Sequence, residues 1–280
     1  MCSKSFSAAV VTFLTTLGLL PRGKSKFLDR LGVLVWVVIV VGLACAWLYV
    51  SREQTELRMN VLTIDNLMVL VTTMLVYPLN SVGTVLALAS AGPQYPWIQS
   101  KHIPLPDCPV LFLFVVISFI WVFIANIISD HLLMFPTNFD KFIAVAEWNF
   151  SFTLTLISSF SIGICVAQFN KSNVQMGQTY TVAETIYYAE KNVAAFKALK
   201  CFVSPIMLVF FVVNSLIFVG YTYMTLSFKQ WDAVPKFFPV YFFPVMSMVY
   251  VCVVIERCYG NFTSITDMLR LHFIEICKDL

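Results

Sequence analysis

A charged residue, Glu147, lies well inside a long apolar stretch of the sequence. An ionisable side chain in a bilayer is costly and therefore often marks a functional site. Its neighbours Trp148, Asn149 and Ser151 offer an aromatic wall and polar groups, the usual make-up of a small-molecule pocket. We therefore expect these four residues to bind a ligand in a cavity open to the outer side of the membrane. The alternative is that Glu147 lies near the outer headgroups or lines a water-filled vestibule.

Tyr77, Pro78 and Asn80 form a second group of candidate residues, in another apolar stretch. Pro78 removes one backbone hydrogen bond, so it should loosen or kink a helix at this point. The carbonyl that it leaves free needs another donor, and the Asn80 amide could supply one. A kink without direct function explains these residues, but kinked helices also flank ligand cavities. Tyr77 and Asn80 therefore complete the set of expected ligand-binding residues.

Motifs for catalysis are absent from the sequence: it has no HExxH, no GxSxG, no Walker loop and no dinucleotide fingerprint. His102, His131 and His272 are scattered, and the eight cysteines include no CxxC pair. We therefore expect no enzymatic activity, no cofactor and no metal site. The net charge of +3 is small and does not indicate a nucleic-acid partner.

The composition indicates that lipid is the solvent for most of the chain. Of the 280 residues, 59% are hydrophobic and only 12% are charged, and the mean hydropathy is +0.83. A soluble core could not bury that much apolar surface. Trp and Tyr gather near the ends of the apolar runs, where amphipathic rings sit at the lipid headgroups. The sequence therefore predicts an integral membrane protein.

Six apolar stretches are long enough for the roughly 20 residues that a helix needs to cross the hydrocarbon core. A helix satisfies its own backbone polar groups, and these stretches lack the alternation of barrel strands. We therefore predict an all-α fold, a polytopic transmembrane helical bundle that forms one domain over residues 1–280. The predicted spans are residues 31–50, 67–91, 109–129, 142–167, 203–228 and 237–256.

Lys and Arg are distributed unevenly between the predicted spans. Of the 18 such residues, 13 fall before residue 31, in 92–108, in 168–202 or after residue 256. The intervening loops hold the other five. Because cytoplasmic loops carry the excess of Lys and Arg, both the N-terminus and the C-terminus are expected in the cytoplasm.

Three further segments have a helical pattern. Residues 5–20 are apolar on one helical face and predict an interfacial helix; if they cross instead, the protein has seven spans and an external N-terminus. Residues 168–202 favour helix from Val182 onward and should extend the fifth span into the cytoplasm. Residues 260–280 predict a cytoplasmic amphipathic helix, which lies on the inner leaflet, packs under the bundle or contacts other subunits.

Both ends of the sequence carry patterns found in one receptor family. Residues 13–21 read Phe-Leu-Thr-Thr-Leu-Gly-Leu-Leu-Pro, and residues 267–280 read Asp-Met-Leu-Arg-Leu-His-Phe-Ile-Glu-Ile-Cys-Lys-Asp-Leu. The first resembles the Leu-Gly-Leu-x-Pro entry of insect-type gustatory receptors, relatives of the odorant receptors. The second resembles the amphipathic segment that follows the fourth span of those receptors.

This resemblance implies a chemosensory, taste-type receptor, a multi-pass protein of the plasma membrane. It would be a subunit of a ligand-gated cation channel that binds a small-molecule tastant or odorant in an outer pocket among the helices. It would assemble as a homo- or hetero-oligomer with related receptor subunits. Family members usually have seven spans and a Thr-Tyr-x5-Gln-Phe-like motif in the last, which is absent here. We therefore interpret the chain as a divergent or truncated member without the pore helix.

Other classes of membrane protein are alternatives. A seven-span G-protein-coupled receptor requires residues 5–20 to cross, and its Asp/Glu-Arg-Tyr and Asn-Pro-x-x-Tyr motifs are absent. A small solute transporter is favoured by Glu147 and by the similar plan of residues 109–167 and 203–256, although multiple buried charges are lacking. An accessory protein that assembles with other membrane subunits would use the tail at 260–280.

Overall fold

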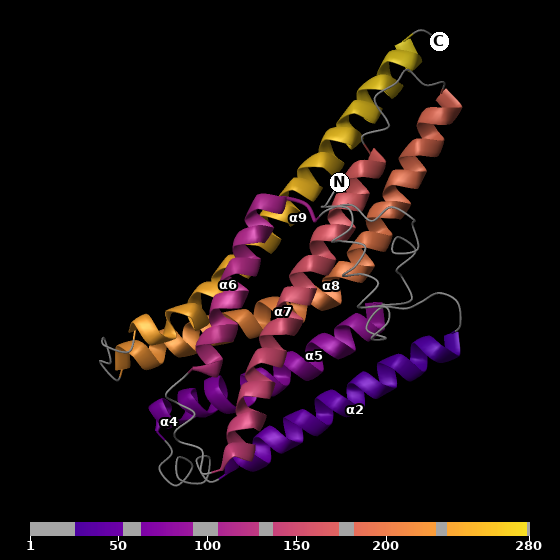
Figure 1. The fold of residues 1–280 in the computed structure, drawn as a ribbon. Helices are drawn as coiled ribbons and strands as arrows, with labels where there is room; N and C mark the ends of the chain where they lie inside the picture. The colour runs from indigo at the N-terminus through magenta and orange to yellow at the C-terminus, as the bar shows by residue number, and fades with distance from the viewer. Residues whose placement is uncertain are drawn as a thin grey trace.

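The secondary structure of the protein is helical throughout the part that the computed structural model describes, which contains no strand (Figure 1). The described residues are 26–52, 63–91, 106–128, 137–173, 182–227 and 234–278. The helices are α2 (Lys26–Val50), α4 (Ile64–Val69), the π-helix η1 (Leu70–Leu75), α5 (Val76–Ala91), α6 (Pro109–Ile127), α7 (Asn138–Asn173), α8 (Val182–Ser227) and α9 (Val234–Lys278). The expected interfacial helix at 5–20 lies outside the described residues.

Five of the described helices are long and apolar enough to cross a membrane: α2, α6, α7, α8 and α9. A sixth crossing results if α4 and α5 together form one bent span. The expectation of an all-helical fold with several helices of membrane-spanning length is therefore confirmed, with five or six candidate spans in the described part of the chain.

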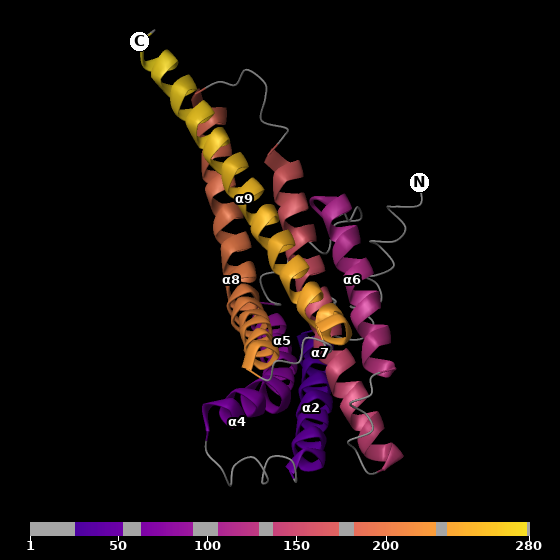
Figure 2. The same ribbon diagram turned by 90° about the vertical axis from the view of Figure 1, so that its left-hand side faces the viewer.

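The helices α8 and α9 extend well past the predicted spans. They contain 46 and 45 residues, or about 68 Å each at 1.5 Å per residue, so neither fits within a core of about 30 Å. Residues 182–202 of α8 and 257–278 of α9 lie side by side and extend past the end of α7 (Figure 2), which contacts the inner part of this pair through Phe169 and Phe196. We call this pair the stalk. The rings of Phe196 and Phe262 stack within it, with their centroids 4.2 Å apart.

The end of α9 differs from the expectation of a separate tail helix. Residues 260–278 continue α9 without a break, and Phe262 of the apolar stripe packs against Phe196 of α8. The first residue of α8 is Val182, the position from which the sequence favours helix. At the ends of the predicted spans the sequence becomes more polar, but its helix propensity stays high. The helices α8 and α9 therefore continue past these ends.

The helix α7 lies in the middle of the bundle and contacts α2, α5, α6, α8 and α9 (Figure 1, Figure 2). Its most apolar part is 72% buried, whereas the corresponding parts of α2 and α6 are 17% and 28% buried. The outer faces of α2 and α6 are therefore available to lipid. The largest side chains with essentially no exposure include Phe152, Phe169, Phe202, Phe210, Phe243, Tyr250, Ile162, Ile206 and Ile217.

The second predicted span is broken. The segments 64–72 and 76–90 meet at 41°, with η1 between them. Pro78 has no N–H to donate to the Met74 carbonyl four residues earlier, and the Trp47 indole donates to that carbonyl instead, at 3.0 Å. The expectation that Asn80 supplies this donor is therefore wrong. The Asn80 amide bonds to α7, as described below.

Candidate functional site

Polar side chains of α5 and α7 face each other across the interface of these two helices. Positions three and four residues apart share one face of a helix, so each helix presents its polar groups as a row. We call this set the polar seam. It consists of Asn80, Ser81 and Thr84 on α5 and Glu147, Ser151 and Thr155 on α7, all of them buried.

Asn80 is the central donor of the seam and is only 1% exposed. Its Nδ2 donates to the carbonyl oxygen and to Oγ of Ser151, both at 2.8 Å, and to Oγ1 of Thr155 at 3.0 Å. Its Oδ1 accepts from the Thr84 hydroxyl at 3.2 Å. Hydrogen bonds between membrane helices contribute about 0.6 kcal/mol each on average. Asn80 therefore stabilises the contact between α5 and α7.

Glu147 is completely buried within the same interface. Its Oε1 accepts from the Ser81 hydroxyl at 3.1 Å, while its Oε2 has no hydrogen-bond partner in the described part of the chain. It lies nine residues after the start of α7, a rise of about 14 Å. Its side chain is enclosed by the surrounding helices and has no exposed surface.

Aromatic rings extend the seam toward α2. The Trp148 ring packs against Trp47 of α2 and Tyr77 of α5, with centroid distances of 5.7 Å and 6.3 Å. Tyr77 also meets Phe152 edge to face at 5.7 Å. The kinked start of α5, which Trp47 holds through the Met74 carbonyl, is therefore lined by aromatic side chains.

The structure brings five of the six expected binding residues together along α5 and the facing side of α7, and it separates Asn149 from them. Two residues along a helix turn the side chain by about 200°, so Asn149 points away from Glu147. Its Oδ1 accepts from Asn126 of α6 at 3.0 Å. Asn149 thus joins α7 to α6 and does not face the seam.

The sequence analysis missed a cluster of hydroxyl groups beside Tyr77. The Tyr77 and Tyr221 hydroxyls bond each other at 2.7 Å, and Tyr241 donates to the Tyr221 carbonyl at 2.7 Å. The Tyr241 hydroxyl also bonds the Thr225 hydroxyl. We call these four residues the tyrosine cluster. The signal in the sequence was the density of Tyr and Thr near the end of one span and the start of the next, which was interpreted only as headgroup anchoring.

The three members of the tyrosine cluster on α8 and α9 are only partly buried, unlike the seam. Close by, Tyr223 donates to the carboxylate of Asp65 at 2.5 Å, which ties the end of α8 to α4. Helices α4, α5, α8 and α9 therefore converge here. The cluster offers hydroxyl groups and aromatic faces at the edge of the bundle, and the seam lies behind it.

At the opposite end of the bundle, the residues before α6 contact α9. Arg257 lies 4.0 Å from the Asp107 carboxylate and donates to Sγ of Cys108 at 2.9 Å. The Tyr250 hydroxyl donates to the Asp107 carbonyl at 3.1 Å. These contacts fix the start of α6 against α9. Over the described ranges, no group of three or more His, Cys, Asp and Glu residues could hold a metal ion.

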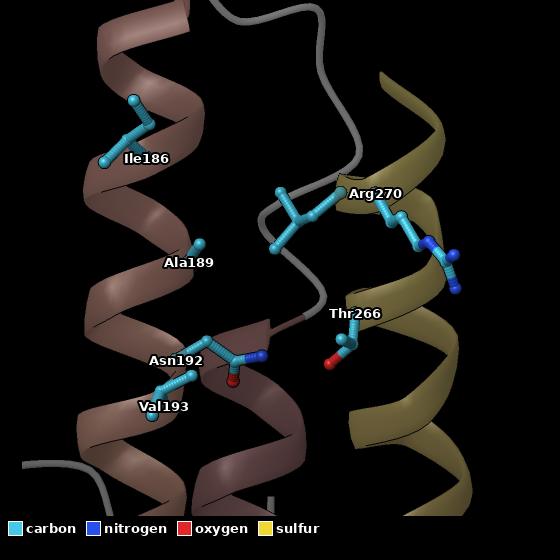
Figure 3. A pocket seen from close by; sticks show the side chains of 7 residues that line it. Ile186, Ala189, Asn192, Val193, Thr266 and Arg270 are labelled. Atoms are coloured by element: carbon cyan, nitrogen blue, oxygen red, sulfur yellow. The ribbon is translucent and has the colours of Figure 1, made fainter. Parts of the chain in front are cut away.

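A groove with a volume of about 280 Å³ separates the two helices of the stalk (Figure 3). Asn192 and Thr266 approach each other across it, and the Arg270 side chain points away from it (Figure 3). The Oδ1 atom of Asn192 is buried without a hydrogen-bond partner in the described residues. The lining residues are Ile186, Ala189, Asn192, Val193, Thr266, Leu269 and Arg270.

Comparison with known proteins identifies no relative. No protein-family model matches the sequence, and neither a curated protein nor a solved structure matches it. The function is therefore argued from the geometry and the sequence.

Proposed function

We propose that this protein is a chemosensory receptor of the plasma membrane that binds a small molecule among its helices, as a subunit of a ligand-gated cation channel. The observation that carries the proposal is the convergence of aromatic and hydroxyl side chains from α5, α8 and α9 at the tyrosine cluster. Small-molecule sites are mostly apolar and aromatic, with a few placed polar groups. The resemblance of the sequence to gustatory receptors supports the same class.

The distribution of Lys and Arg supports an outward-facing binding site. With both termini in the cytoplasm, the end of α8 at Tyr221 and the start of α9 at Tyr241 lie on the outer side. The stalk then lies in the cytoplasm, where it can contact related subunits. A ligand from outside would meet the partly exposed hydroxyls before it reached Tyr77 and the seam.

The ligand that suits this cluster is a small aromatic or apolar molecule with one or two hydrogen-bonding groups. Such a group can replace the bond between Tyr77 and Tyr221, which joins α5 to α8. Helix α8 continues from Tyr221 to Val182 in the stalk. A change in the tilt of α8 at its outer end therefore moves its cytoplasmic end. In this way ligand binding would alter the contacts between the stalk and related subunits.

The test is electrical recording from cells that express the full chain alone or with related receptor subunits. A panel of small aromatic alcohols, ketones and esters should include at least one that evokes a cation current. Tyr221→Phe should raise the half-maximal concentration about tenfold, because one hydrogen bond to the ligand is lost. Tyr259→Phe, on an exposed tyrosine of the stalk, is the matched control and should leave it unchanged. Responses that are equal in both variants would contradict the proposed site.

A small solute transporter is the second candidate, and the broken span is the observation that favours it. Transporter sites lie near discontinuous helices at the middle of the bilayer. Here η1 interrupts the span formed by α4 and α5. Glu147 of α7 is buried and contacts Ser81 in the α5 part of this span. Proton-coupled uptake without current, lost in Glu147→Gln, would favour transport over reception.

A further inference from the structure

The Glu147 carboxyl group is buried and has no positive partner in the described part of the chain. Its side chain has no exposed surface. Among the described residues, its Oε1 accepts from Ser81, and its Oε2 has no hydrogen-bond partner. A charged group in a low-dielectric interior needs compensation. The other acids near these helices are engaged elsewhere: Asp65 accepts from Tyr223, and Asp140 accepts from Thr137.

Serine hydroxyl groups of α5 and α7 lie on the face of α7 that carries this carboxyl group. Ser81 contacts Glu147 directly, and Ser151 lies one turn further along the same face of α7. Asn80, next to Ser81 in sequence, contacts both Ser151 and Thr155. A hydroxyl oxygen has two lone pairs, and an amide oxygen also has two, so each retains capacity to bind a further positive group.

The single carboxyl group and the close packing around it determine which class of ligand this site can bind. Hard cations prefer carboxylate, hydroxyl and carbonyl oxygen over nitrogen or sulfur. One carboxylate balances one positive charge, whereas a divalent ion would leave a net positive charge buried. The seam residues interlock and are each less than about a tenth exposed, so a compact ion fits better than an organic ammonium.

We propose that Glu147, together with Ser81 and Ser151, binds a sodium ion between α5 and α7. The ion binds the Oε2 atom that otherwise has no partner among the described residues, and it bridges α5 and α7 at the buried end of the seam. Tyr77 lies one turn from Asn80 and belongs to the tyrosine cluster, so sodium binding and ligand binding would be coupled and each would change the affinity for the other. The sodium site itself does not depend on the receptor function.

The test is thermal unfolding of the purified full chain in lipid nanodiscs at constant pH. Unfolding is followed in NaCl and in choline chloride or KCl at the same ionic strength. An ion that binds only the folded state raises its stability with concentration. We expect NaCl to raise Tm by about 2–4 °C over the other two salts, in a saturable manner.

Two substitutions and one control assign this effect to the seam. Glu147→Gln keeps the shape of the side chain and should abolish the sodium dependence of Tm. Ser81→Ala removes one oxygen and should raise the half-saturating NaCl concentration about tenfold; it serves as the test if Glu147→Gln does not fold. Ser118→Ala removes an equally buried serine that bonds only to Val115 of its own helix, and it should retain the full response.

Three results would overturn the proposal. Equal Tm values in all three salts would exclude a bound sodium ion, and equal values in NaCl and KCl would exclude selectivity for sodium. A Tm that responds to pH but not to sodium would show that a proton compensates the carboxylate. None of these readouts involves an added ligand or a current, so a failed receptor assay leaves the sodium test intact.

Discussion

The helices α7 and α2 are both long enough to cross the membrane, but they are built in opposite ways. The most apolar part of α2 has a mean hydropathy of 2.7 and is 17% buried, whereas that of α7 has a mean hydropathy of 1.8 and is 72% buried. The less apolar helix is thus the more deeply buried one. In lipid, apolar side chains gain nothing by leaving the solvent, so helices associate through packing and through polar groups that need partners.

The largest difference between the two helices should appear when a big side chain is removed. Phe152 of α7 has no exposed surface and packs edge to face against Tyr77 and Phe243. Phe152→Ala should lower the free energy of unfolding by about 3–5 kcal/mol, because it leaves a cavity. Leu34→Ala, on α2 with 59% exposure, should change it by less than about 0.5 kcal/mol. Chemical unfolding in detergent micelles measures both, and similar losses would contradict the comparison.

Two glycines should respond with opposite signs. A Cβ on Gly163 of α7 would lie 1.9 Å from the Tyr250 hydroxyl oxygen, whereas a Cβ on Gly42 of α2 would meet nothing within 4 Å. Gly163→Ala should therefore destabilise by about 1–3 kcal/mol. Gly42→Ala should stabilise by up to about 1 kcal/mol, because alanine has the higher helix propensity. Thermal unfolding of both variants tests this prediction, and a shift of the same sign would contradict it.

Removal of a seam hydrogen-bond donor should have a smaller effect. Asn80→Leu removes the amide group that contacts three oxygen atoms of α7 and should destabilise by about 1–2 kcal/mol in the same unfolding assay. Thr222→Val is the control and should be nearly neutral, because the Thr222 hydroxyl donates to the Phe218 carbonyl of its own helix. An equal cost for both would show that the seam does not join the helices.

The sequence predicted the helical class, because apolar length identifies the spans, and it named three of the six seam residues, Asn80, Glu147 and Ser151. It grouped Glu147 and Ser151 with Asn149 because they are close in sequence. The structure turns Asn149 toward Asn126 of α6, since neighbours in sequence diverge around a helix. Adjacency in sequence was a poor guide to a shared site within a helix.

Contacts between distant helices could not be predicted in this way. The donor to the Met74 carbonyl is Trp47, from a different span, and Tyr221 and Tyr241 meet Tyr77 only after α5, α8 and α9 pack together. The sequence predicted the extension of α8 from Val182 and a helix at 260–280, but it did not predict that residues 260–278 continue α9 without a break. These features depend on tertiary packing, for which a single sequence has no direct signal.

The most direct test of the proposed receptor is a double-mutant cycle on Tyr77 and Tyr221, read as the half-maximal ligand concentration for the evoked current. Each single change to Phe should raise that concentration about tenfold. Because the two hydroxyls bond each other and would bind the ligand as a pair, the double variant should be no worse than either single variant. Two independent effects that multiply to about a hundredfold, or no effect at all, would contradict a ligand site at the tyrosine cluster.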